Sequence, residues 1–192
     1  MTPEHNSARH DRDGVARAAL ALLDEVGLAD LSMRRIAARL GVQPSALYWH
    51  FQSKQELLAE LADRITAGVA ASEADVLGTA RALLDALFTY RDGAELVLST
   101  YALRLGSSHA RIALEHALSG SDDAEARATA ILHFVLGHAA LVQQRMHADS
   151  HGAAGASSEP DPAHGLDRVF DIGVRALAGE VSASSAPRRD RA

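Results

Sequence analysis

Two short helical segments joined by a tight turn constrain the fold of this 192-residue chain more than any other feature. Ser32 can cap a first helix over Met33–Leu40, whose apolar residues fall on one face. Gly41 then allows the left-handed backbone that a sharp turn requires. Pro44 opens a second helix over Pro44–His50, because its fixed φ angle and missing N–H do no harm in a first helical turn. This spacing predicts a helix-turn-helix motif.

Helical periodicity continues on both sides of this motif. Upstream, an apolar stripe over Asp13–Val26 ends at Gly27, and downstream Ser53–Glu56 forms a capping box that opens a longer helix. The 39 alanines and many leucines favour helix, and β-branched residues are sparse. We therefore predict an all-α fold, with further helices over residues 75–91, 94–105, 108–118, 122–147 and 163–178.

The formal charge of −6 argues against a nucleic-acid partner only until the charges are divided along the chain. Ser32–Lys54 contains four basic residues and no acidic one, whereas residues 65–192 carry 11 basic and 16 acidic residues. Exposed charges more than about 10 Å apart are largely screened at physiological salt. The basic segment can therefore attract phosphate although the whole chain is acidic.

An aromatic run closes the second short helix. Leu47 and Phe51 lie four residues apart and are predicted to enter the core. Tyr48, Trp49 and His50 cannot all be buried with them, and each has a polar tip that can reach a phosphate. The alternative is that Trp49 packs inside the small helical unit, as isolated tryptophans often do.

Residues 14–65 resemble the DNA-binding domain of the TetR family of tetracycline-repressor-like regulators. The resemblance implies a three-helix, helix-turn-helix DNA-binding domain over residues 11–65 and a helical ligand-binding and dimerisation domain over residues 66–180. Residues 181–192, rich in Ser, Ala, Pro and Arg, are expected to form a disordered tail. The residues that carry the resemblance are Ala18, Leu22, Leu23 and Gly27, then Leu31–Ala37, Leu40–Val42 and Ala46–Phe51, followed by Lys54, Leu57 and Leu58.

The same resemblance implies which residues contact DNA. The second short helix, with Gln43 before it, enters the major groove and places Pro44, Ser45 and Ala46 at base edges. Arg34 matches a position that can contact guanine through two hydrogen bonds. Relatives often carry Thr or Gly where this chain has Pro44–Ala46, so their operator sequences do not transfer. The residues expected to hold phosphates are Tyr48, Trp49, His50 and Lys54.

The resemblance weakens after residue 65 but suggests a regulated protein. Tyr90–Ala94 and Leu98–Thr100 are similar to a stretch of the ligand domain of tetracycline repressors. There, a histidine four residues after the glycine coordinates the drug's magnesium ion; here that position is Val97, which cannot ligate a metal. A second drug-contacting histidine corresponds to Ala70. We therefore expect an unknown small-molecule effector other than tetracycline–magnesium.

The effector pocket is expected among residues 77–118 and 134–138. Core packing is the alternative for its apolar members, because apolar helical residues are buried by default. The candidate lining residues are Phe88, Leu96, Thr100, Tyr101, Leu105, His109, Phe134 and His138.

Small residues on the last two long helices suggest a partner subunit. Gly137 on the first of these helices and Gly173 on the second, together with two alanines, allow close helix approach. The family resemblance implies a homodimer through residues 122–147 and 163–178, which would match a palindromic operator. The alternative is that these helices pack only within one chain.

The sequence contains no positive signal for catalysis or for a metal. His147 and His151 have a zinc-ligand spacing but straddle a helix end and a loop, so solvated surface residues are expected. His133 and His138 are five residues apart and face different sides of their helix, where a hydrogen-bonded core histidine is more common than a ligand. No Ser/His/Asp order, Gly-rich phosphate loop or H-E-x-x-H motif is present. We expect neither an enzyme nor a cofactor.

Location follows from what the chain lacks. It has no cysteine, no apolar leader and no run of about 18 apolar residues, so a cytoplasmic protein without membrane contact is expected. The sequence predicts a DNA-binding repressor that a small molecule releases from a palindromic operator. The alternative is a small-molecule-binding or protein-interaction module whose helix-turn-helix is only structural.

Overall fold

The computed structural model describes residues 11–70, 75–106, 108–150 and 162–180. This part of the chain contains nine α-helices and no strand, which confirms the all-α prediction. The helices are α2 (Arg12–Val26), α3 (Met33–Leu40), α4 (Pro44–Leu47), α5 (Lys54–Thr66), α6 (Val76–Phe88), α7 (Gly93–Ala102), α8 (His109–Ala117), α9 (Ala124–Ser150) and α10 (Pro162–Ala178). The predicted tail over residues 181–192, and His151, lie outside the described residues.

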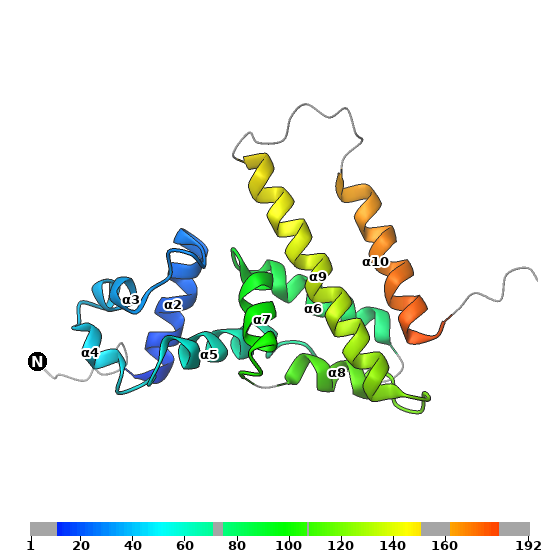
Figure 1. Cartoon of the computed structure of the whole chain (residues 1–192), viewed down its shortest axis with the longest axis horizontal. Coiled ribbons are helices and arrows are strands. Elements are labelled where there is room, and N and C mark those ends of the chain that lie inside the picture. Colours follow the sequence, from blue (N-terminus) through cyan, green and yellow to red (C-terminus); the bar gives the residue numbers. More distant parts are fainter. Residues whose placement is uncertain (1–10, 71–74, 107, 151–161, 181–192) are drawn as a thin grey trace, which may run out of the picture.

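Helices α2 to α5 form a head (residues 11–66) at one end of the molecule, and α6 to α10 form a larger body (residues 75–180) (Figure 1). Side-chain caps start the head helices: Asp11 accepts from the N–H of Gly14 at 2.6 Å, and Ser32 accepts from that of Arg35 at 3.3 Å. Such caps satisfy N–H groups that have no partner within the helix.

The capping box predicted at Ser53 is formed in a modified way. The Ser53 hydroxyl accepts from the N–H of Glu56 at 3.1 Å, as expected. The Glu56 carboxylate, however, accepts from the N–H of Gln52 at 2.8 Å, one residue before the cap. Hydrogen bonds between Ser53 and Glu56 and between Gln52 and Glu56 therefore hold the loop before α5 against the first turn of the helix.

Several helices end before the last residue of their apolar pattern, because a turn or a left-handed residue interrupts the helix first. The second short helix ends at Leu47 rather than His50, since the N–H groups of His50 and Phe51 both bond to the Leu47 carbonyl in a turn. In the body, α7 ends at Ala102 rather than Leu105, because Arg104 adopts a left-handed backbone with φ of 56°. Helix α9 starts at Ala124, after another left-handed residue.

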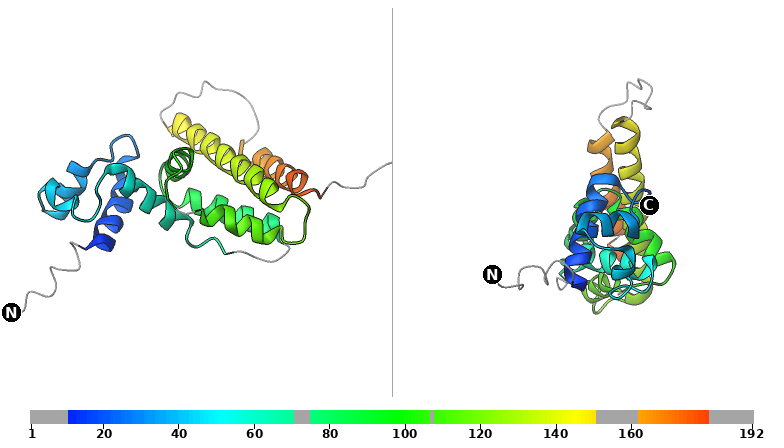
Figure 2. Two further views of the ribbon diagram at one scale, coloured as in Figure 1. Left: turned by 60° about the horizontal axis from the view of Figure 1, so that its bottom comes forward. Right: turned by 90° about the vertical axis from the view of Figure 1, so that its left-hand side faces the viewer.

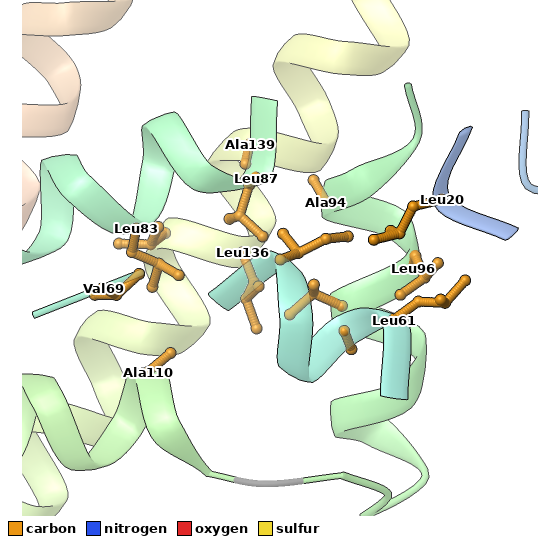
Figure 3. Packing of buried hydrophobic residues seen from close by; sticks show 14 of the residues in the cluster. Leu20, Leu61, Val69, Leu83, Leu87, Ala94, Leu96, Ala110, Leu136 and Ala139 are labelled. Atoms are coloured by element: carbon orange, nitrogen blue, oxygen red, sulfur yellow. The ribbon is translucent and has the colours of Figure 1, made fainter. Parts of the chain in front are cut away.

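Helix α5 joins the head to the body. It packs against α2 in the head and against α7, α6 and α8 in the body. One continuous cluster of buried apolar side chains consequently runs through both parts, and Figure 3 shows its middle, with contributions from α2 (Leu20), α5 (Leu61), α7 (Leu96) and α9 (Leu136). Within the body, α9 packs against α6, α7, α8 and α10 (Figure 2).

A buried amide fixes the turn between α6 and α7. Gln143 of α9 donates to the carbonyls of Leu87 and Tyr90 at 3.3 and 3.1 Å and accepts from the N–H of Ala94 at 3.0 Å. This turn also reaches the head, because the N–H of Arg91 donates to Asp24 of α2 at 3.0 Å. The long helix of the body is thus linked through one turn to the head.

No helix in the described part of the chain is long and apolar enough to cross a membrane.

Candidate nucleic-acid interface

The turn between α3 and α4 has the predicted left-handed glycine. Gly41 lies at φ 70° and ψ 30°, and its N–H and that of Val42 bond to the carbonyls of Ala38 and Ala37 at 3.2 and 3.0 Å. This closes the end of α3 and turns the chain sharply into Pro44, the first residue of α4. The helix-turn-helix predicted from the spacing is therefore formed.

The aromatic residues after α4 divide between core and surface. Leu47 and Phe51 are fully buried, which confirms the prediction that they enter the core. Trp49 is 89% exposed and Tyr48 is 49% exposed, so the alternative in which Trp49 packs the interior is wrong. Two large aromatic faces on the surface of a small helical head cost free energy unless a partner covers them.

Two of the four basic residues counted in Ser32–Lys54 are already neutralised by carboxylates of the protein. Arg35 pairs with Asp30 at 3.2 Å and Arg39 with Glu25 at 2.6 Å. The hydrogen bond between Arg39 and Glu25 lowers the pKa of the Glu25 carboxyl, so that pair stays charged. Within the described part of the chain, neither Arg34 nor Lys54 takes part in an ion pair. These two cations are available to a phosphate or a base.

The remaining predicted DNA contacts lie on or beside the same short helix. Gln43 is exposed and precedes α4 without forming a side-chain cap, and Ser45 is exposed on the helix. Pro44, Ala46 and His50 are half-buried. All of the predicted contact residues except Arg34 and Lys54 therefore fall within residues 43–50.

Arg12 is a residue of this region that the sequence reasoning missed. Its guanidinium lies 4.2 Å from the ring centre of Phe51 and donates to the carbonyl of His50 at 2.6 Å. It also contacts Glu56 and Glu60 of α5, at 2.9 and 3.1 Å. The sequence signal was a pair of glutamates four residues apart on one face of the helix over 54–66, but nothing in the sequence shows that they meet the start of α2.

A small cavity of about 30 Å³ lies where α5 enters the body. Of the predicted effector contacts, Thr100, Tyr101 and Leu105 line it, and so does Val97. The contribution of α5 was not predicted from the sequence, because nothing in the local pattern shows that this helix extends into the body. The lining residues are Ala62, Asp63, Thr66, Val97, Thr100, Tyr101, Leu105, Ser108, Ala110, Arg111, Leu132 and Leu136.

The other predicted effector contacts lie away from this cavity. Leu96 is buried in the core, whereas Phe88 and His109 are exposed at the end of α6 and the start of α8. Phe134 and His138 lie against Phe170 of α10, with ring centres 5.9 and 5.3 Å from it.

The histidines of α9 do not gather into a metal site. Among the described residues, no three His, Cys, Asp or Glu side chains lie close enough together to hold a metal ion. His133 is exposed with its ring 5.6 Å from that of Tyr101, and His147 lies 3.4 Å from Asp92.

A helix-turn-helix head with exposed aromatic and basic side chains, joined to a larger helical body, defines a DNA-binding transcriptional regulator. Residues 16–61 match the family described as "Bacterial regulatory proteins, tetR family". The class A tetracycline repressor of transposon 1721 from Escherichia coli is 38% identical over 168 residues, which cover 81% of this chain and 76% of that protein. The chain therefore belongs to the TetR family of bacterial regulatory proteins, whose members are not enzymes.

Solved structures show the same fold. BioQ with its natural double-stranded DNA operator has a TM-score of 0.70 and 32% identity, covering 87% of this chain and 97% of that one. A single-residue variant of TetR from Acinetobacter baumannii AYE, in complex with minocycline, has a TM-score of 0.69 and 30% identity, covering 88% of this chain and 95% of that one.

Proposed function

We propose that this protein is a ligand-responsive repressor that binds a palindromic operator as a homodimer and is released by a small molecule. The observation that carries the proposal is the surface of α4 and the following turn, where Tyr48 and Trp49 are exposed. Arg34 and Lys54, which form no ion pair within the described residues, lie on the helices that flank this surface. Aromatic and cationic groups of this kind contact phosphates while a short helix contacts base edges. The operator complex of the related BioQ structure supports this use of the head.

Residues 11–65 would form the DNA-binding domain, and residues 66–180 the ligand-binding and dimerisation domain. Support for dimerisation comes from exposed apolar side chains on α9 and α10: Leu141, Met146, Val169 and Ile172. Val169 and Ile172 project from α10 on the side away from the buried Phe170 and Val174. Burying such a face against a second copy would recover its hydrophobic free energy and set two heads about one DNA turn apart.

The cavity between α5 and the body supports the regulatory part of the proposal. It is walled by the last turn of α5 on one side and by α7, α8 and α9 on the other. A ligand that displaces the α5 wall of this cavity would also move the head, because α5 belongs to the head and packs against α2. Such a ligand would bind best to a head position unsuited to the operator and would shift the equilibrium away from DNA. We expect the ligand to differ from tetracycline–magnesium, because Val97 in the cavity wall offers no metal ligand.

The experiment is a titration of the full-length protein against double-stranded DNA from the region upstream of its own gene, at several salt concentrations. We expect Lys54→Ala to weaken all DNA binding and to reduce the slope of log affinity against log salt by about one. Arg104→Gln serves as a control, since it removes an exposed charge from the body and keeps a long polar side chain at that position. If Tyr48→Ala combined with Lys54→Ala leaves operator affinity unchanged, the proposed docking is wrong. No retarded band at low salt would favour a module whose helix-turn-helix is only structural.

A further inference from the structure

We propose that Arg12 is a positioning residue that holds the segment 48–54 in the conformation that contacts DNA phosphates. This inference rests on the proposed use of that segment in DNA binding. Arg12 is the first residue of α2 and lies 38 positions before His50 in the sequence, yet its guanidinium reaches the turn after α4.

Every nitrogen of the guanidinium has an acceptor. Nη1 donates to the His50 carbonyl at 2.6 Å and to Glu56 Oε1 at 2.9 Å. Nε and Nη2 donate to Glu60 Oε2 at 3.3 and 3.1 Å. The planar guanidinium has five N–H donors in a fixed arrangement, so it can reach all of these acceptors in one orientation. A lysine ammonium cannot make the same set of hydrogen bonds.

Arg12 bonds to the protein at two points, one within and one just after the segment 48–54, which carries the candidate phosphate-binding residues. On one side Arg12 fixes the carbonyl of His50, directly after Tyr48 and Trp49. On the other it fixes Glu56, whose second oxygen accepts from the N–H of Gln52 just before Lys54. The guanidinium also lies over the ring of Phe51, 4.2 Å from the ring centre. The exposed aromatics and the first residue of α5 are thus held by one side chain.

The charge of Arg12 is already neutralised within the protein. Its hydrogen bond to Glu56 raises the pKa of the guanidinium and lowers that of the Glu56 carboxyl, so both groups stay ionised together. A cation that two carboxylates share offers little net attraction to DNA. We infer that Arg12 affects DNA binding through the geometry of its neighbours rather than as a contact of its own.

Arg64 provides a matched control on the same pair of helices. It joins Asp13 of α2 to Glu60 of α5 at 2.5 and 2.9 Å, but it makes no contact with residues 48–54 in the structure. Arg12→Lys and Arg64→Lys therefore remove comparable links between α2 and α5 and keep the total charge. Only the first variant frees the turn after α4.

The test compares wild type, Arg12→Lys and Arg64→Lys in operator titrations over a range of salt, well below the thermal midpoint of each variant. We expect Arg12→Lys to lower operator affinity by about tenfold and to reduce the salt slope by about one, because a phosphate contact is lost. Arg64→Lys should lower the thermal midpoint without changing the slope. Glu56→Gln should also weaken binding, although it removes a negative charge close to the DNA.

Three outcomes would overturn the inference. Equal affinities for Arg12→Lys and Arg64→Lys would mean that Arg12 only stabilises the head. A weaker Arg12→Lys with an unchanged slope would show that the phosphate contacts do not depend on it. Tighter binding by Glu56→Gln would show that charge, not position, dominates. If wild type itself does not bind the operator, the proposed function fails, and the positioning role fails with it.

Discussion

Asp92, in the turn between α6 and α7, accepts a hydrogen bond from the backbone N–H of Leu28 at 2.8 Å. The two residues lie 64 positions apart, so this bond joins the body to the end of α2 in the head. Asp92 holds a left-handed backbone with φ of 56°, a conformation that aspartate tolerates better than most residues. Its other carboxylate oxygen lies 3.4 Å from Nδ1 of His147 on α9.

Replacing Asp92 should weaken this junction. We expect Asp92→Ala to lower the free energy of unfolding by about 1–3 kcal/mol, because the Leu28 N–H loses its acceptor and alanine disfavours the left-handed backbone. Asp92→Asn keeps an acceptor and tolerates that backbone, so its loss should be under about 1 kcal/mol. Urea denaturation measures both values. Equal losses for the two variants would mean that the hydrogen bond contributes nothing.

The buried amide of Gln143 should be among the most sensitive polar positions of the body. Gln143→Ala removes the partner of the Ala94 N–H and one partner each of the Leu87 and Tyr90 carbonyls, although the Tyr90 carbonyl still accepts from the N–H of Gly93 at 3.0 Å. We expect a loss of about 1–3 kcal/mol in unfolding free energy. Gln144→Ala, at the exposed next position, should change stability by less than about 0.5 kcal/mol. Similar values for the two variants would contradict the role assigned to Gln143.

Two glycines on the long helices should respond oppositely to alanine. A Cβ on Gly173 would lie less than 3.0 Å from three ring atoms of Phe134, so Gly173→Ala should destabilise the α9–α10 packing by about 1–3 kcal/mol. Within one subunit a Cβ on Gly137 would meet nothing within 4 Å, so Gly137→Ala should stabilise a monomeric form of the protein by about 0.5–1 kcal/mol. Thermal unfolding at equal protein concentration checks both signs. A Gly173→Ala variant as stable as wild type would show that the Phe134 ring moves aside freely.

The imidazole of His138 should make stability depend on pH. Burial lowers its pKa below 6.5, and Arg145 adds to this while Asp167 opposes it. The unfolded chain therefore binds a proton more readily than the folded one, so this contribution to stability is complete above about pH 6.5 and is lost as the pH falls toward the folded-state pKa. His138→Gln should flatten the dependence measured by urea unfolding between about pH 5 and 8. His133→Gln, on an exposed position of the same helix, should retain it.

A single charged substitution on α10 can test the proposed dimer face of α9 and α10. Ile172→Glu on α10 should convert the protein into a monomer and lower operator affinity, because a buried unpaired carboxylate opposes association. Ile112→Glu, which places the same charge on an exposed apolar position of α8, should leave the oligomeric state unchanged. Sedimentation equilibrium separates the cases, and a dimeric Ile172→Glu would exclude this face from the interface.

Local features of the head could be predicted closely from the sequence. The bounds of α3, the cap at Ser32 and the left-handed Gly41 follow from neighbouring residues, and all are confirmed. The burial of Leu47 and Phe51 also follows, since residues four apart on a short helix share a face. Each of these features is decided within a few residues of chain, where propensity and periodicity act.

Features that depend on distant residues could not be predicted. Counting charges along the chain suggested four available cations, but Arg35 and Arg39 find carboxylates at Asp30 and Glu25, outside the counted segment. Likewise, His138 lies against Phe170, 32 positions later, and not in the cavity. Periodicity shows which side of a helix is apolar, but it does not identify the helix that covers that side.

The single tryptophan of the chain is also the most exposed large hydrophobic residue in the part that the structure describes. Indole fluorescence from this protein therefore arises only from Trp49, on the turn after α4, and reports on its hydration. Shielding of the indole by DNA should shift its emission to shorter wavelength and reduce quenching by iodide, whereas a ligand in the body should leave it little changed. The chain thus carries its own optical probe of operator occupancy, and no label is needed to follow binding and release in real time.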